Sequence, residues 1–265
     1  TLYRSSAASD VYKRQQDGAV ALITIARPDA MNSFNTELRR DLLAAFQAAA
    51  GDSSVRAVVL TGEGRSFSAG ADLKGSLSTD RTVEQQLQEE YRPVMECIAT
   101  MGQPVIAAVG GSAAGIGMSY ALACDLMVMA DNAFLLSPFT TISLVPDGGL
   151  NWLLVHQLGY RRAFQLSIES ERISAERCLE LGLTNKVVPA DDLLTESLAW
   201  ARSIAERAPL SVAATKKAMR HATGGSWAST FDIEAPMQDA LRGSDDCAEG
   251  VAAFFEKRKA VFKGK

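Results

Sequence analysis

The sequence predicts an α/β domain followed by a region made of helices alone. Short apolar segments rich in β-branched residues alternate with helix-like segments as far as about residue 190, and only helix-like segments follow. Small residues come directly after two of the strand-like segments, at 62–74 and at 110–117. With 265 residues, the chain is long enough for one sizeable core with an appendage.

The predicted strands are short and apolar, which is typical of strands buried in a sheet. They cover residues 19–25, 56–61, 104–109, 126–130, 133–136 and 185–188. The stretch 104–130 is long and mostly apolar, as a membrane span would be, but it contains four glycines, two serines and Asp125 and begins like a strand. We therefore assign it to the protein core.

The predicted helices are bounded by residues that start or stop helices. Asn35 or Thr36 and Ser174 can cap two of them, and Gly159 and Gly182 follow the ends of two others. The predicted helices span about residues 36–50, 83–101, 118–123, 148–158, 175–181, 191–207, 209–221 and 227–255.

The chain divides into three parts. Residues 1–16 are rich in Ser, Ala and Arg without either periodicity, so we expect a disordered leader, either native or derived from a vector. Residues 17–205 form the α/β core, and residues 206–265 form the helical region with a basic tail. Within the core, the polar segment 76–82 predicts a mobile loop.

The composition argues against several classes of protein. A net charge of −4 gives no basic surface, so no nucleic-acid partner is expected. The two histidines, His156 and His221, cannot form a histidine-rich metal site, and no metal is expected. Four cysteines without C-x-x-C pairing predict free thiols in a reducing compartment. With no secretory segment and no membrane span predicted, we expect a cytoplasmic protein.

Backbone N–H groups and one carboxylate are the predicted functional groups. The segment 104–123 passes from a strand through glycines into a helix, which leaves free N–H groups at the helix start that a ligand can approach closely. The segment 145–149 places Asp147 on a tight turn before another helix. We expect these two turns to face one another, one supplying hydrogen-bond donors and the other a base.

Four motifs together resemble the crotonase family, also called the enoyl-CoA hydratase/isomerase family. They are Gly64-Arg-Ser-Phe-Ser-Ala-Gly-Ala-Asp-Leu-Lys74, Gly111-Ser-Ala-Ala-Gly-Ile-Gly117, Ala123-Cys-Asp125 and Leu144-Val-Pro-Asp-Gly-Gly149. The resemblance extends from Gly18 to Lys265. It implies a spiral of ββα units, a C-terminal helical region for trimerisation, and a homotrimer or dimer of trimers.

The same resemblance implies an acyl-CoA substrate whose thioester oxygen binds between the N–H groups of Ala71 and Ile116. Proton removal alpha to a thioester builds negative charge on that oxygen, and preorganised donors stabilise the enolate more than the ground state. Ile116 replaces the glycine frequent at its position, but a backbone donor survives this change unless its φ must be positive.

The acid–base residue separates hydratases from isomerases in this family. The positions of the two hydratase glutamates correspond to Ser119 and Phe139, neither of which is a carboxylate. Asp147 is placed as in the isomerase-like branch, which includes the phenylacetate-pathway isomerases. A single base can take a proton from one carbon and return it to another. We therefore expect an acyl-CoA isomerase with Asp147 as acid and base.

The resemblance also implies where coenzyme A binds, as part of the substrate and with no separate cofactor. Backbone near Ala69, Asp72 and Leu73 would contact it, and Arg27 would lie near its phosphates. Two further contacts would come from a neighbouring subunit, through Phe262 and Lys263.

Several alternatives stay open at this stage. Asp147 can simply cap a helix. Ser119 lies in a sequence close to a nucleophile elbow, so a serine hydrolase would use it with His156 or His221. The Gly-x-Gly pairs at 62–64 and 115–117 lack the third glycine of a dinucleotide site. An enoyl-CoA hydratase and a non-catalytic acyl-CoA-binding protein are the two alternatives within the family.

Overall fold

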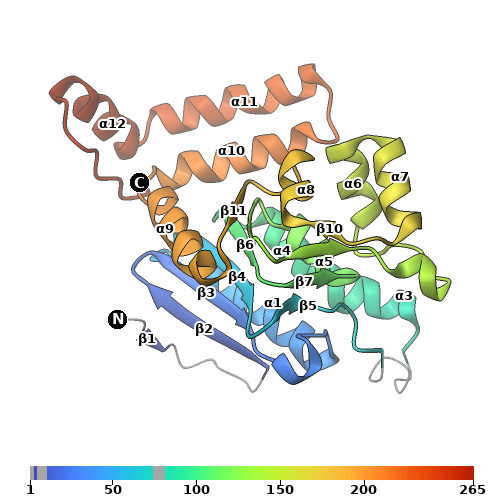
Figure 1. The fold of residues 1–265 in the computed structure, drawn as a ribbon. Helices are drawn as coiled ribbons and strands as arrows, with labels where there is room; N and C mark the ends of the chain where they lie inside the picture. Colours follow the sequence, from blue (N-terminus) through green and yellow to red (C-terminus); the bar gives the residue numbers. More distant parts are fainter. Residues whose placement is uncertain (1–2, 5–10, 74–80) are drawn as a thin grey trace.

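The computed structural model describes residues 3–4, 11–73 and 81–265 (Figure 1). Two β-sheets form its centre, helices surround them, and the last helices lie beside this core. The predicted α/β class is confirmed.

The larger sheet holds most of the buried apolar strands. It consists of β1 (Tyr3–Arg4), β2 (Tyr12–Asp17), β3 (Val20–Ile25), β4 (Ala57–Gly62), β6 (Val105–Val109), β8 (Leu126–Ala130) and β11 (Lys186–Val188), in the order β1-β2-β3-β4-β6-β8-β11. From β3 to β11 every neighbouring pair is parallel, whereas β1 and β2 pair antiparallel. All five residues of β6 are buried, as its continuous apolar run predicts.

The smaller sheet positions the turns of the site. It consists of β5 (Ser66–Ser68), β7 (Ser112–Ala114), β9 (Phe134–Leu136) and β10 (Ile173–Ser174), in the order β10-β9-β7-β5. Three times, a strand of the larger sheet is followed by a strand of the smaller one and then by helix: β4 with β5, β6 with β7, and β8 with β9. This is the spiral of ββα units that the family resemblance implies.

The helices begin at the caps that the sequence indicates. They are α1 (Thr36–Gly51), α3 (Val83–Gln86), α4 (Arg92–Thr100), α5 (Ile116–Ala123), α6 (Leu150–Leu158), α7 (Tyr160–Glu169), α8 (Ala175–Glu180), α9 (Leu193–Ala205), α10 (Pro209–Ala222), α11 (Trp227–Arg242) and α12 (Asp245–Glu256). The side chain of Asn35 accepts from the N–H of Leu38 at 2.9 Å, and that of Ser174 from the N–H of Arg177 at 3.2 Å. Both predicted caps are confirmed.

Strand β2 corrects the expectation of a disordered leader through residue 16. Its six residues pair along their full length with β3. Only the first residue of this strand, Tyr12, is buried. The sequence Tyr-Lys-Arg-Gln-Gln-Asp therefore needs no alternation of apolar and polar residues, and hydropathy does not reveal the strand. The rest of the leader, apart from residues 3–4 and Val11, lies outside the described residues.

Short or irregular elements were also not predicted. The expected helix 83–101 contains a π-helical turn at Leu87–Tyr91 between α3 and α4. The expected helical segment 227–255 forms two helices, because Ser244 caps α12 by accepting from the N–H of Cys247. Strands β5, β7 and β10 and helix α7 were missed. Most of the expected loop 76–82 lies outside the described residues.

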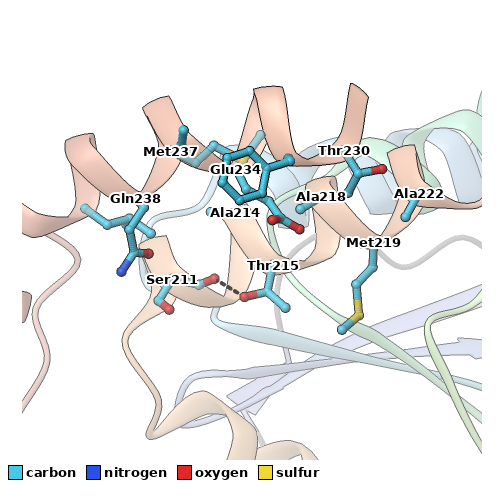
Figure 2. Close-up of a pocket in the computed structure, with 13 residues that line it drawn as sticks. Ser211, Ala214, Thr215, Ala218, Met219, Ala222, Thr230, Glu234, Met237 and Gln238 are labelled. Carbon is cyan, nitrogen blue, oxygen red and sulfur yellow. Dashed lines mark hydrogen bonds between the residues drawn. The ribbon is translucent and has the colours of Figure 1, made fainter. Parts of the chain in front are cut away.

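The C-terminal helices α10 and α11 form a hairpin beside the core (Figure 1). Neither helix has a buried residue, and a groove of about 490 Å³ runs between them (Figure 2). Met219, Trp227 and Phe231 are exposed on this hairpin. Ion pairs contribute to its attachment to the core, because Lys216 and Arg220 both pair with Asp125.

The apolar stretch 104–130 is part of the core and contributes β6, β7, α5 and β8. Within the described ranges, no helix has both the length and the apolar character needed to cross a bilayer.

Candidate active site

The turn after β5 leaves one main-chain donor free. Gly70 adopts a φ of +99°, and its N–H donates to Ser68 Oγ at 3.1 Å. The N–H of Phe34 donates to the Gly70 carbonyl at 2.8 Å, and the N–H of Asp72 donates to the Phe34 carbonyl at 3.1 Å. Between these bonds, the N–H of Ala71 has no acceptor among the described residues.

A second free donor lies at the start of α5. The carbonyl of Gly115 accepts from the N–H groups of Met118 and Ser119, so the helix begins at Ile116. The N–H of Ile116 belongs to the first turn and finds no acceptor within the part of the chain that the structure describes. Ile116 is not among the residues with positive φ, so an isoleucine fits this position without backbone strain.

These two turns lie against each other. A Cβ atom on Gly70 would lie 2.8 Å from the Ala114 carbonyl oxygen and 3.5 Å from the nitrogen of Ile116. Only glycine allows this approach of backbone to backbone. The structure therefore brings the turns that carry Ala71 and Ile116 together, as the sequence interpretation requires.

Asp147 lies on the turn before α6 with a largely buried carboxyl group. Its Oδ1 atom is buried and has no hydrogen-bond partner among the described groups. Burial raises the pKa of Asp147 to about 6, opposed by a hydrogen bond from its own main-chain N–H. Helix α6 begins after Gly149 without any side-chain cap. The carboxylate of Asp147 therefore does not cap this helix.

Helix α5 holds the Asp147 turn in place. The hydroxyl of Ser119, a fully buried residue, donates to the main-chain carbonyl of Asp147 at 2.9 Å. Gly148 follows with a φ of +62°, and a Cβ there would lie 3.0 Å from Ile116 Cγ1 and from Ser119 Cβ. The same helix thus carries a free N–H at its start and holds the Asp147 turn through Ser119, one turn later.

The Asp147 carboxylate opens into a cavity of about 510 Å³ between the π-helical turn, α4 and α6, called here the Asp147 cavity. Apolar side chains such as Leu87, Met95, Trp152 and Leu153 form much of its wall. Glu96 also lines it, but this side chain is exposed and paired with Arg92 at 2.6 Å. Asp147 is therefore the carboxylate in the interior of the cavity.

Tyr91, on the π-helical turn, lines the same cavity and was missed by the sequence analysis. Its hydroxyl oxygen accepts from Arg39 Nη1 at 2.8 Å, and the guanidinium also lies 4.6 Å from the ring centroid. Helical periodicity contains no signal for this pair, because the two residues are far apart in the sequence and meet only through the packing of α1 against the π-helical turn.

Neither of the two positions that correspond to the hydratase glutamates carries an acidic side chain. Ser119 is bonded to the Asp147 carbonyl, and Phe139 is a buried ring that lies near Gly115. The serine hydrolase alternative also lacks its geometry. His156 is bonded to the Trp152 carbonyl and His221 to Ser229, and among the described residues no hydrogen bond joins either histidine to Ser119.

Four residues expected near coenzyme A lie around the Ala71 turn. Arg27 and Asp72 form an ion pair at 3.1 Å, and Ala69 and Leu73 are exposed. The N–H of Ala69 donates to the Met31 carbonyl at 2.9 Å. These positions lie beside the turn that carries the free N–H of Ala71.

Phe262 and Lys263 lie elsewhere on the chain. The Phe262 carbonyl accepts from Arg56 at 2.7 Å, directly before β4, whereas the site turns follow the opposite ends of the strands. The N–H of Lys263 donates to Asp246 at 2.6 Å. Within one chain they do not reach the site, and their contribution from a neighbouring subunit stays a prediction.

Comparison with known proteins agrees with this architecture. A family model described as enoyl-CoA hydratase/isomerase matches residues 15–265. A probable enoyl-CoA hydratase of Rhodobacter capsulatus is 39% identical over 246 residues, covering 93% of this chain and 95% of the relative. The 1,2-epoxyphenylacetyl-CoA isomerase of Escherichia coli is 33% identical over 255 residues, covering 93% and 95%.

Solved structures give the same result for the fold. The crystal structure of an enoyl-CoA hydratase from Polaromonas sp. JS666 has a TM-score of 0.90 at 36% identity and covers 95% of this chain and 99% of that one. The enoyl-CoA hydratase of Bacillus anthracis has a TM-score of 0.92 at 31% identity, covering 96% and 100%. The chain therefore belongs to the enoyl-CoA hydratase/isomerase family, the crotonase family, and is an enzyme of that family.

Proposed function

We propose that this enzyme is an acyl-CoA isomerase that shifts a double bond through a thioester enolate. The N–H groups of Ala71 and Ile116 bind the thioester oxygen, and Asp147 moves the proton. The observation that carries this proposal is the buried, unpartnered Oδ1 of Asp147, on a turn that packs against the helix bearing the Ile116 N–H. Ser119 and Phe139, which replace the paired acids of hydratases, support the same conclusion.

A pKa of about 6 suits a group that acts as base and then as acid. At neutral pH the carboxylate is mostly ionised and can remove the proton alpha to the thioester carbonyl. The charge moves to the thioester oxygen, where two main-chain donors stabilise it. The carboxylic acid then returns the proton to the far carbon of the allylic system, which completes the double-bond shift without any net change in composition.

Hydration is the second candidate reaction, because relatives are named for it. One is the Rhodobacter capsulatus protein above, and another is the 2,3-dehydroadipyl-CoA hydratase of Escherichia coli, 32% identical over 255 residues. Incubation with crotonyl-CoA decides between the reactions. A loss of enoyl absorbance, with formation of the hydroxyacyl-CoA, would assign a hydratase. Binding of acyl-CoA without turnover across a panel of substrates, 3-enoyl-CoA thioesters included, would assign a non-catalytic acyl-CoA-binding protein.

We also infer that the chain assembles through its C-terminal helices, as a trimer or a dimer of trimers. Support comes from α10 and α11, which bury none of their residues within one chain and expose Met219, Trp227 and Phe231. In such an assembly Phe262 and Lys263 would reach the coenzyme A of a neighbouring subunit, while Arg27 would lie near its phosphates. Light scattering coupled to gel filtration measures the mass and tests this assembly.

Substitution Asp147→Asn tests the isomerase assignment. The amide keeps the size of the side chain but cannot take up the proton, so double-bond migration in a 3-enoyl-CoA should fall by about 10²–10⁴-fold while acyl-CoA binding persists. The readout is the rise in absorbance of the conjugated enoyl thioester. Asp191→Asn is the matched control, since Asp191 is exposed and lies outside the Asp147 cavity. Unchanged turnover in Asp147→Asn would reject the assignment.

A further inference from the structure

The hydroxyl of Tyr91 is held from one side by a buried cation. Arg39 is 2% exposed, and its guanidinium donates to Tyr91 Oη at 2.8 Å, to Glu90 at 2.7 Å and to the Phe34 carbonyl at 3.1 Å. Glu90 and Tyr91 are neighbours on the π-helical turn, so this turn places two consecutive side chains on one guanidinium. π-helical turns are frequent at functional sites.

This arrangement leaves the hydroxyl hydrogen of Tyr91 without an acceptor. The oxygen already accepts from Arg39, so its own O–H must point elsewhere. No described residue accepts a hydrogen bond from it, and no hydrogen bond joins it to Asp147. A buried donor without a partner is unfavourable, and a ligand that supplies an acceptor relieves this cost. Burial raises the pKa of Tyr91, so the phenol keeps its hydrogen at neutral pH.

Two of the residues that line the Asp147 cavity carry buried polar groups of opposite kind. Asp147 offers a hydrogen-bond acceptor, and Tyr91 has a hydroxyl hydrogen for which no described residue is an acceptor. Gln88, Arg92, Glu96 and Arg220 also line the cavity, and the rest of its wall is largely apolar. The charge of Asp147 is one of the causes that raise the pKa of Tyr91, after burial, as expected for groups that share one cavity. A plain hydrocarbon chain has no atom that could accept from Tyr91.

We propose that Tyr91 is a specificity-determining residue whose O–H donates a hydrogen bond to an oxygen on the acyl group. The preferred substrates are then acyl-CoA thioesters with an oxygen substituent on the acyl chain, in preference to plain hydrocarbon chains. Sites built to bind a polar group reject analogues that lack it, because the protein group is left unpaired. This inference rests on the proposed function, since it assumes that the acyl chain enters the Asp147 cavity.

Matched pairs of acyl-CoA thioesters test the proposal. Calorimetric titration with 3-oxobutyryl-CoA against butyryl-CoA, and with 4-oxopentanoyl-CoA against pentanoyl-CoA, places a carbonyl acceptor at C3 or at C4. For at least one pair, the wild-type enzyme should bind the oxygenated member about tenfold more tightly. In Tyr91→Phe this preference should disappear, while the Kd of the hydrocarbon member stays unchanged.

Tyr120→Phe is the matched control. Tyr120 is also a buried tyrosine that packs against Phe34, with ring centroids 4.5 Å apart, but it does not line the Asp147 cavity. This control should keep the preference for the oxygenated member. Three outcomes would overturn the role of Tyr91. They are an equal loss of affinity for both members of each pair in Tyr91→Phe, the same loss of preference in Tyr120→Phe, and a wild type without any preference. If the wild type still binds the hydrocarbon thioesters, the proposed function stays intact. If it binds none of the four thioesters, both the role of Tyr91 and the proposed function are overturned.

Discussion

Two aspartates lie beside helix α5 in opposite environments. Asp125, just after the end of the helix, accepts from the N–H of Val105 at 2.9 Å and pairs with Lys216 at 2.7 Å and Arg220 at 2.8 Å. Asp147 contacts the helix through Ser119, and its buried Oδ1 accepts from no described group. The first is fully bonded and joins the C-terminal hairpin to the core. The second lacks such partners and is available to a substrate.

The environments explain why we assign the same side chain to stabilising the fold at one position and propose it for chemistry at the other. Around a buried carboxylate, cations and an N–H offset part of the desolvation cost, and removing the carboxylate leaves those cations uncompensated. A buried carboxylate without them favours its protonated form, and this shifts its pKa into the range useful for proton transfer. The comparison predicts that one substitution, Asp to Asn, changes the free energy of unfolding in opposite directions at the two sites.

Asp125→Asn should give the largest effect on stability. The change leaves Lys216, which is largely buried, and Arg220 without their anion, and losing one partner of a buried ion pair costs about 3–5 kcal/mol. Urea denaturation at neutral pH measures this loss. A stability equal to that of the wild type would show that the ion cluster does not hold the hairpin on the core.

Asp147→Asn should instead raise the free energy of unfolding at pH 7, by up to about 3 kcal/mol. The folded-state pKa of about 6 lies above the ordinary value of 3.8, so ionisation opposes folding. The folded state binds more protons than the unfolded state between about pH 4 and pH 6, and wild-type stability therefore decreases as the pH rises through this window. Urea titrations at a series of pH values measure the free energy of unfolding, and for Asp147→Asn they should show no such decrease.

The pH dependence of turnover should follow the same group. Because the base must be ionised, kcat/KM should fall about tenfold for each pH unit below about pH 6 and level off above it. Initial rates with a 3-enoyl-CoA across this range measure the profile. A rate that is constant down to pH 4 would remove Asp147 from the role of base.

Ser119→Ala should give the smallest effect of the four. It removes one hydrogen bond to the Asp147 carbonyl, worth about 1 kcal/mol, and loosens the turn that holds the base. We expect a decrease in kcat of about tenfold with little change in KM, because the acyl-CoA contacts remain. Ser119→Cys, of similar size, serves as the control for packing. A larger change in KM than in kcat would contradict a positioning role.

The sequence predicts those parts of the fold whose signal is local. The apolar runs of β3, β4, β6 and β8 and the caps Asn35 and Ser174 are readable because burial and capping depend on neighbouring residues. Strand β2 was missed because its residues are mostly polar, and β5 and β7 because each has only three residues, which carry little β-strand signal.

The candidate site likewise has parts that the sequence predicts and parts that only the structure reveals. Asp147 and the glycine-bearing turns at Ala71 and Ile116 were identified from motifs and from their position after strands. The bond from Ser119 to Asp147, the Arg39–Tyr91 pair and the Asp125 cluster join residues between 28 and 95 positions apart in the sequence. No spacing pattern reports such contacts, so only the folded chain reveals them.

The hydroxyl of Ser119 has a consequence for enzyme engineering. Introducing glutamate at this position, to supply one of the hydratase acids, would place a longer charged side chain in a site with no exposed surface and would remove the bond that fixes the Asp147 turn. The two catalytic designs therefore compete for the same space, and conversion of one into the other would require rebuilding the turn at 145–149 together with the helix.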